Sequence, residues 1–148
     1  MEIAVLALGC FWGPEIKFSK LNGVVRTEVG YCGGNTSKTN YREVCSGKTN
    51  HAEVVKIEFD NSKITYEKIL NHFFDIHNPT TLNKQGPDIG TQYRSEIFYL
   101  TENQKKIATN VLKNYDKKFD GKIVTTISKI KNYCKAEDYH QKYLEKKF

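Results

Sequence analysis

The sequence lacks the features that mark several large classes of protein. No apolar run approaches the roughly 18 residues needed to span a membrane, and there is no internal repeat or low-complexity tract. Hydrophobic residues make up 39% of the chain and aromatic residues 12%, which is too apolar for a disordered protein. The 148 residues are therefore expected to form one domain over 1–148, because that length suits a single core.

The chain also lacks a concentrated charge. Its 23 lysines and arginines outnumber 17 acidic residues, which gives a formal charge of +6. The lysines occur singly or in pairs, usually with an acidic residue nearby, whereas a protein that binds nucleic acid needs a basic patch or stripe. We expect a solvated lysine-rich surface, with neither nucleic acid nor a membrane as partner.

Metal-binding and disulfide patterns are missing as well. The four cysteines, Cys10, Cys32, Cys45 and Cys134, show no CxxC and no metal-ligand spacing. A chain of this length can fold without disulfide bonds. The segment before Cys10 has neither the basic start nor the apolar length of a signal peptide. We expect a cytoplasmic protein with reduced thiols and with no bound metal or cofactor.

Short apolar segments predict the strands of a mixed fold. Strands are expected at 3–8, 24–31, 52–59 and 93–100, and helices at 16–21, at 66–76 and behind a capping pair formed by Thr101 and Gln104. A further strand is expected at 123–130 and a last helix at 137–146, with loops at 33–50 and 77–91. The order β-α-β-β-α-β predicts an α+β fold with a ferredoxin-like split βαβ core, an appended helix and long irregular loops.

Cys10 is the first candidate for chemistry. It follows the first expected strand and precedes a helix, so backbone N–H groups and the helix dipole should lower its pKa and make the thiol nucleophilic. Phe11 and Trp12 come next, and two large aromatic side chains in a turn suit the walls of a site for a small apolar group. A buried inert thiol is the commoner fate of cysteine, but the aromatic turn favours a nucleophile.

Glu53 is the second candidate. If the strand at 52–59 includes it, Glu53 lies on the same face as Val55 and Ile57. A carboxylate on an apolar face is desolvated, which raises its pKa and lets it carry a proton near neutral pH. If the strand begins at Val54 instead, Glu53 is an exposed loop residue, and the pattern favours neither alternative.

Tyr41, Asp88 and Tyr93 lie in or beside the two long loops, where sites are usually built. Tyrosine hydroxyls can donate to a substrate oxygen, although packing is the commoner role for any one of nine tyrosines. The four histidines form no cluster with cysteine, so structural roles are expected for them. The residues indicate a thiol enzyme, while a peroxidase, a hydrolase and a basic RNA-binding module stay open as alternatives.

Six segments, in order, resemble the A-type peptide methionine sulfoxide reductases. They read GCFWGPE at 9–15, GYCGG at 30–34, YREVCSG at 41–47, HAEV at 51–54, DIGTQYRS at 88–95 and AEDYHQ at 136–141. Matching motifs extend over about 3–143, nearly the whole chain, and this ordered set is far more specific than Cys-Phe-Trp alone.

The resemblance implies that the single domain is catalytic and that Cys10 attacks the sulfur of a methionine sulfoxide. Glu53 would then protonate the sulfoxide oxygen, while Phe11 and Trp12 hold the ε-methyl group. Sulfoxide sulfur becomes electrophilic as its oxygen gains a proton, so an acid beside a thiolate suits this reaction. Methionine leaves, and Cys10 becomes a sulfenic acid.

Three further roles follow from the resemblance alone. Tyr41 and Tyr93 would hydrogen-bond to the sulfoxide oxygen, and Asp88 would support the site through hydrogen bonds. The A type is expected to take the S epimer, free or in proteins, which is a protein-repair and antioxidant function.

The sequence departs from the family in how the thiol is recycled. Many members carry resolving cysteines in a C-terminal tail, and this sequence ends at Phe148 without one. We expect a one-cysteine enzyme reduced by an external thiol, either by glutathione directly or by glutaredoxin with glutathione. The alternative is recycling by thioredoxin with Cys32 as a local resolving cysteine. Cys45 matches a family cysteine without a general catalytic role, and Cys134 lies where the family has a packing residue.

Overall fold

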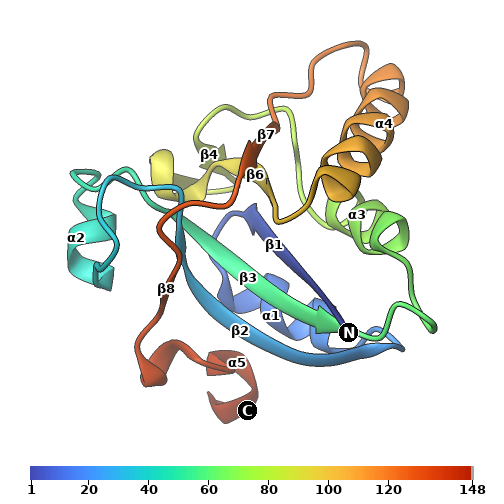
Figure 1. Ribbon diagram of the computed structural model, residues 1–148. Helices are drawn as coiled ribbons and strands as arrows, with labels where there is room; N and C mark the ends of the chain where they lie inside the picture. Colours follow the sequence, from blue (N-terminus) through green and yellow to red (C-terminus); the bar gives the residue numbers. More distant parts are fainter. Residues whose placement is uncertain (148) are drawn as a thin grey trace.

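Six strands form one mixed sheet in the computed structural model, which describes residues 1–147 (Figure 1). The strands are β1 (Glu2–Leu8), β2 (Val24–Cys32), β3 (Ala52–Phe59), β6 (Ser95–Tyr99), β7 (Thr126–Lys129) and β8 (Cys134–Lys135), in the order β7-β6-β1-β3-β2-β8. All neighbours pair antiparallel except β6 and β7. The helices are α1 (Trp12–Ser19), α2 (Tyr41–Cys45), α3 (Tyr66–Asp75), α4 (Glu102–Lys118) and α5 (Tyr143–Lys147). This architecture confirms the α+β class.

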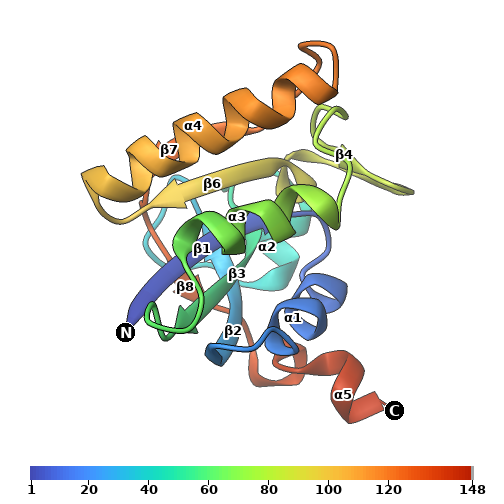
Figure 2. The same cartoon turned by 90° about the vertical axis from the view of Figure 1, so that its right-hand side faces the viewer.

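The sheet is covered on both faces by different means. Helices α1 and α3 pack on one face, and α4 packs against α3 and β6 (Figure 2). The segment that joins β7 to β8 crosses the other face (Figure 1), where Ile130 and Tyr133 contact a smaller apolar cluster. Because both faces are covered, Val5 and Leu6 of β1 are both buried, which explains the continuous apolar run of this strand.

Several predicted elements are confirmed closely. The structure has β3 at the predicted residues, and α3 ends one residue before the predicted end. Before α4, the Thr101 hydroxyl accepts a hydrogen bond from the backbone N–H of Gln104 at 3.1 Å, as the capping pair predicts. The side-chain oxygen of Gln104 accepts a hydrogen bond from the N–H of Leu100 rather than from that of Thr101.

Other boundaries were wrong, and the differences matter for the site. Helix α1 begins at Trp12 rather than at residue 16, because Gly13 and Pro14 are compatible with a first helical turn. The fourth predicted strand begins only at Ser95, since 91–93 form a 3-10 turn. The predicted strand at 123–130 shrinks to β7, and the predicted last helix divides into a 3-10 turn at Asp138–His140 and α5.

Both predicted loops contain regular structure. In the first, α2 is capped by Asn40, whose side chain accepts from the N–H of Glu43 at 2.9 Å. In the second, β4 (Lys84–Gln85) and β5 (Asp88–Ile89) form a small hairpin. Each element is too short to produce a recognisable hydrophobic period.

Candidate active site

Cys10 lies in the connection between β1 and α1, half-buried at the edge of the sheet. Gly9 precedes it with a φ of +98°, and a Cβ at Gly9 would lie 2.8 Å from the side chain of Gln85. The chain can therefore turn here only with glycine, and the turn packs closely against Gln85 of the β4–β5 hairpin.

The pKa of Cys10 moves in the direction opposite to the sequence prediction. The backbone N–H of Trp12 donates to the sulfur and lowers the pKa, as expected at a helix start. Burial has the larger effect, and the nearby carboxylates of Glu53 and Asp88 add to it, so the pKa rises to about 11. At neutral pH the free thiol is therefore protonated.

Glu53 lies inside β3, opposite Tyr31 in the register with β2. Of the two alternatives left open by the pattern, the strand position is the one observed, and only 1% of the side chain is exposed. Its Oε1 accepts from the N–H of Phe11 at 3.1 Å, while its buried Oε2 has no partner among residues 1–147. Burial raises the pKa to about 8, and Asp88 contributes to the rise. At neutral pH the carboxyl group of Glu53 is therefore protonated. The proton lies on Oε2, because Oε1 already accepts the N–H of Phe11.

Phe11 and Trp12 are held by aromatic neighbours from the end of the chain. The indole N–H of Trp12 donates to Nδ1 of His140 at 3.0 Å, and its ring stacks on Tyr143 at 3.9 Å between centroids. The ring of Phe11 packs 5.3 Å from that of His140. The two residues therefore form a rigid aromatic wall beside Cys10.

Three side chains anchor the segment 136–143, which carries His140 and Tyr143, to the sheet and to α1. Gln141 accepts from the N–H of Val29 and donates to its carbonyl, as a neighbouring strand would. Glu137 accepts from the hydroxyl of Tyr31 at 2.8 Å and from the N–H of Tyr41 at 3.0 Å. The position of the aromatic wall therefore depends on contacts between residues about 100 positions apart.

The third fastening is Glu15, a carboxylate that is only 2% exposed. Its oxygens accept from the N–H of Lys142 at 2.7 Å and from the hydroxyl of Thr27 at 3.0 Å. Glu15 thus connects α1 directly to the segment that carries Tyr143.

Replacing Glu15 by alanine is expected to release the terminal segment. The buried hydroxyl of Thr27 and the backbone N–H of Lys142 lose their acceptor, which lowers the free energy of unfolding by about 1–3 kcal/mol. Trp12 is the only tryptophan, so its emission should shift to longer wavelength in the folded variant as Tyr143 and His140 leave it. Emission spectra and urea unfolding measure both effects. The matched control is Glu145→Ala, at an exposed position of the same segment; equal spectra and midpoints for the two variants would contradict this account.

Tyr41, Tyr93 and Asp88 all reach the neighbourhood of Cys10 and Glu53. Tyr93 is half-buried, and burial together with Glu53 raises its pKa to about 12. The hydroxyl of Tyr41 donates to the sulfur of Cys45, and burial is the main cause of its raised pKa. At neutral pH both phenols therefore keep their protons and can act as donors.

The structure does not bring Cys32 to this group. Cys32 is fully buried, and its thiol donates to the carbonyl of Lys131 at 3.2 Å. It packs with Ala7 and Phe98 in the apolar cluster on the other face of the sheet, because successive side chains of a strand alternate. This placement gives no support to Cys32 as a local resolving cysteine, which stays a prediction. Cys134, in β8, donates to the carbonyl of Thr39 at 3.6 Å.

Four residues of the neighbourhood were not singled out from the sequence as site residues: Glu137, His140, Tyr143 and Cys45. His140 was assigned a structural role, yet it forms part of the aromatic wall. The sequence signal that could have found them is the resemblance of 136–141 and 41–47 to family motifs. Their placement follows from tertiary contacts.

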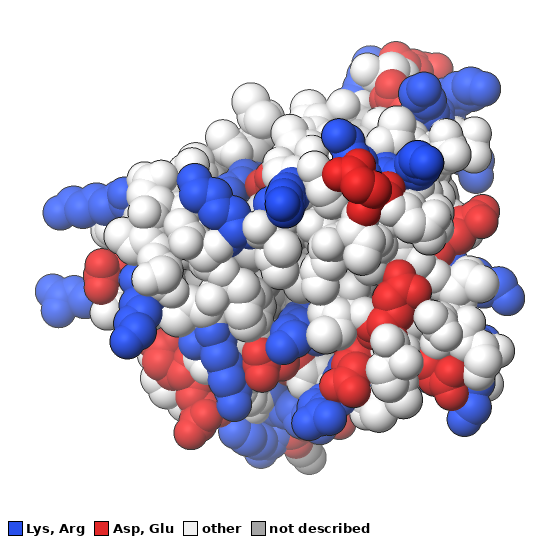
Figure 3. Space-filling view, viewed as in Figure 1, with Lys and Arg blue, Asp and Glu red and all other residues white. Residues whose placement is uncertain are grey.

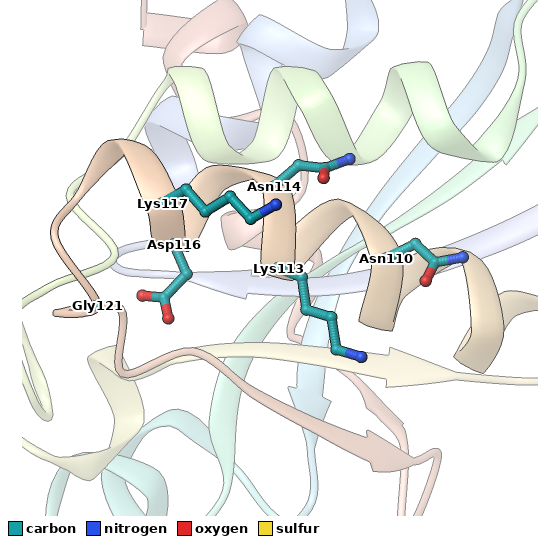
Figure 4. A pocket seen from close by; sticks show the side chains of 6 residues that line it. All are labelled: Asn110, Lys113, Asn114, Asp116, Lys117 and Gly121. Atoms are coloured by element: carbon teal, nitrogen blue, oxygen red, sulfur yellow. The ribbon is translucent and has the colours of Figure 1, made fainter.

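Charged side chains elsewhere on the surface are mixed rather than gathered into a site. Figure 3 shows lysine and arginine side chains interspersed with acidic ones over the face in view. A hollow of about 700 Å³ lies on α4 near Lys113 and Asp116, and its side chains spread along the helix without converging (Figure 4). Within 1–147, no group of three histidine, cysteine or acidic residues could hold a metal ion, and no helix is long and apolar enough to cross a membrane.

A thiol, a proton-bearing acid and an aromatic wall at one sheet edge are typical of a thiol-dependent oxidoreductase. The model of the family "peptide methionine sulfoxide reductase" matches residues 2–148. A protein of Pelagibacter ubique named peptide methionine sulfoxide reductase MsrA is 67% identical over 147 residues, which cover 99% of this chain and 100% of that protein.

Solved structures agree with the sequence match. Mxr1 from Saccharomyces cerevisiae in reduced form is 41% identical with a TM-score of 0.94, over 98% of this chain and 84% of that one. Mxr1 in complex with Trx2 is 28% identical with a TM-score of 0.69, over 96% and 84%. The chain belongs to the peptide methionine sulfoxide reductase family, and it is an oxidoreductase of the A type that reduces methionine sulfoxide.

Proposed function

We propose that the enzyme reduces the S epimer of methionine sulfoxide, free or in proteins, through a sulfenic acid on Cys10. The observation that carries the proposal is the pairing of Cys10 with Glu53, a buried acid whose pKa of about 8 keeps it protonated at neutral pH. We assign the whole domain 1–148 to this reaction and place it in the cytoplasm, where thiols stay reduced. Its function there is protein repair.

The protons of the two groups account for the chemistry. Cys10 attacks the sulfoxide sulfur while the Oε2 proton of Glu53 passes to the sulfoxide oxygen, which makes the sulfur electrophilic. The thiol proton restores Glu53, the oxygen is transferred to Cys10, and methionine leaves. The products, methionine and a Cys10 sulfenic acid, contain all the atoms of the reactants.

The remaining site residues orient the substrate. Phe11 and Trp12 hold the ε-methyl group against the aromatic wall, and Tyr93 donates to the sulfoxide oxygen. Tyr41 donates to the same oxygen once its hydroxyl leaves the sulfur of Cys45. Asp88 supports the acid, since its charge helps to raise the pKa of Glu53.

An external thiol supplies the electrons that return Cys10 from the sulfenic acid to the thiol. The sequence favoured glutathione with glutaredoxin, whereas the complex of Mxr1 with Trx2 supports thioredoxin as the reductant. We retain both as candidates. The strand order β6-β1-β3-β2, antiparallel throughout, supports a ferredoxin-like split βαβ core to which β7, β8 and α4 are added.

The experiment that tests the proposal offers each epimer separately to the reduced enzyme without reductant. The S epimer should release one methionine per chain in a single burst, and the R epimer should release none. A burst with the R epimer, or with neither, would contradict the proposal. Faster oxidation of Cys10 by hydrogen peroxide than by sulfoxide would favour a peroxidase.

A further inference from the structure

Cys45 is the cysteine that the fold brings to the catalytic group. It is the last residue of α2, it is exposed, and electrostatic interaction with its sulfur affects both Cys10 and Tyr93. Tyr41 lies one helical turn before it and directs its hydroxyl to the Cys45 sulfur. Cys32, by contrast, faces the other side of the sheet.

A surface hollow of about 440 Å³ adjoins Cys45. Residues 45–48, which follow from the end of α2, line one side, and residues 89–92 line the other. The second segment lies between Asp88 and Tyr93, which belong to the catalytic neighbourhood. The hollow therefore gives an external molecule access to Cys45 at the edge of the active site.

Helix α2 is anchored at its first residue, Tyr41, whose N–H donates to Glu137 and whose ring packs on His140, so its C-terminal end is the part that can move. The helix has five residues, and Val44 is the one residue of the helix that is buried. Gly47 follows it with a φ of +78° and with open space around the position of a Cβ. Segments with few buried contacts open locally at low free energy, and a disulfide needs Cα atoms within about 7 Å.

We propose that Cys45 is the resolving cysteine, an inference that rests on the proposed function. The Cys45 sulfur attacks the sulfur of the Cys10 sulfenic acid, the S–O bond breaks and the S–S bond forms. The sulfenic hydroxyl leaves as water with the proton of the Cys45 thiol, so the atoms balance. One thiol of an external dithiol then attacks the exposed Cys45 sulfur, forms a mixed disulfide with it and releases Cys10 as a thiol. The second thiol of the dithiol attacks its own sulfur in that mixed disulfide and releases Cys45 as a thiol, so the dithiol leaves as a disulfide and both cysteines are reduced.

Tyr41 contacts the thiol that attacks the sulfenic acid. Its hydroxyl donates to the Cys45 sulfur in the free enzyme, and hydrogen bonding favours the thiolate that performs the attack. Burial has the larger effect and raises the pKa of Cys45 overall, while the hydrogen bond from Tyr41 limits that rise.

The test is a single turnover with excess methionine S-sulfoxide and no reductant, followed by intact mass and peptide mapping. Wild type should release one methionine per chain, lose two hydrogens and yield a peptide that joins Cys10 to Cys45. The Cys45→Ser variant should release the same methionine but retain a dimedone-reactive sulfenic acid on Cys10. The matched controls Cys32→Ser and Cys134→Ser should still form the disulfide.

Other outcomes separate this inference from the proposed function. Methionine release with a persistent sulfenic acid in wild type, or with a disulfide to Cys32, overturns the role of Cys45 and leaves the proposed function intact. Absence of methionine overturns the proposed function. In that event hydrogen peroxide can form the sulfenic acid directly, and the same mapping then supports or overturns the Cys10–Cys45 disulfide on its own.

Steady-state rates give a second measurement. With thioredoxin as reductant, Cys45→Ser should turn over at least about tenfold more slowly than wild type, because the protein dithiol loses its exposed disulfide. With dithiothreitol, a small thiol that reaches Cys10 directly, the two rates should agree within about twofold. Equal rates with thioredoxin would overturn the proposal.

Discussion

Replacement of Cys10 by serine is expected to lower kcat for methionine S-sulfoxide by about a thousandfold or more. A serine hydroxyl remains protonated at neutral pH, and its oxygen would have to form a weak O–O bond to accept the sulfoxide oxygen. The substitution is small and the site is half-buried, so the fold should persist. Methionine formed per unit time, measured with dithiothreitol as reductant, gives the rate.

The control for this experiment is Cys134→Ser. Cys134 is also half-buried, and its thiol contacts the carbonyl of Thr39, so this variant tests the general effect of losing a thiol. It should retain wild-type activity. A Cys10→Ser enzyme with more than a few per cent of the wild-type rate would remove Cys10 from the mechanism.

Replacement of Glu53 by glutamine is expected to slow kcat by about 10²- to 10⁴-fold, the usual contribution of a general acid. The amide can still accept from the N–H of Phe11, so the local geometry and KM should change little. Glu58→Gln is the matched control, because Glu58 lies on the same strand and pairs with the exposed Arg26. Similar losses in the two variants would show that the acid at position 53 is not required.

The pH dependence carries a signature of the same carboxyl group. Since Glu53 has a pKa of about 8, kcat of wild type should fall as pH rises through that value and the acid loses its proton. The Glu53→Gln variant has no such proton to lose, so its slower rate should lack this decline. A wild-type profile that is flat to pH 9 would contradict the assignment of Glu53 as the acid.

Stability should depend on pH through Glu53 as well. Its pKa is raised from 4.5 in the unfolded chain to about 8 in the folded one, so the folded state binds an extra proton between these values. The free energy of unfolding of wild type, relative to Glu53→Gln, should therefore fall by about 1.4 kcal/mol per pH unit from pH 5 to pH 8 and then level off. Urea titrations of both proteins at several pH values measure this difference.

The sheet could be predicted largely from local patterns. The continuous apolar run before Gly9 and the strand 52–59 both require burial, and the helix 66–75 shows its apolar face directly. Helix α2 and the β4–β5 hairpin could not be predicted in this way. Each spans only two to five residues, and their stability comes from a cap and from neighbouring segments rather than from a hydrophobic period.

For the site, the sequence alone determined the adjacent side chains. Cys10, Phe11 and Trp12 follow one another after a buried strand, so the thiol and the aromatic residues meet whatever the rest of the chain does. The face on which Glu53 lies follows from the sequence if β3 begins at Ala52, as it does in the structure, because side chains alternate along a strand.

Only the tertiary structure decided the electrostatics and the partners of these residues. Burial and two carboxylates that are distant in sequence raise the pKa of Cys10, although the start of the helix alone predicts a lower value. The aromatic wall is completed by His140 from the far end of the chain, and the pleat of β2 directs Cys32 away from the site while α2 brings Cys45 to it. The physical reason is that desolvation, charge proximity and the face of a side chain depend on which segments pack together, and these contacts join residues as many as 128 positions apart.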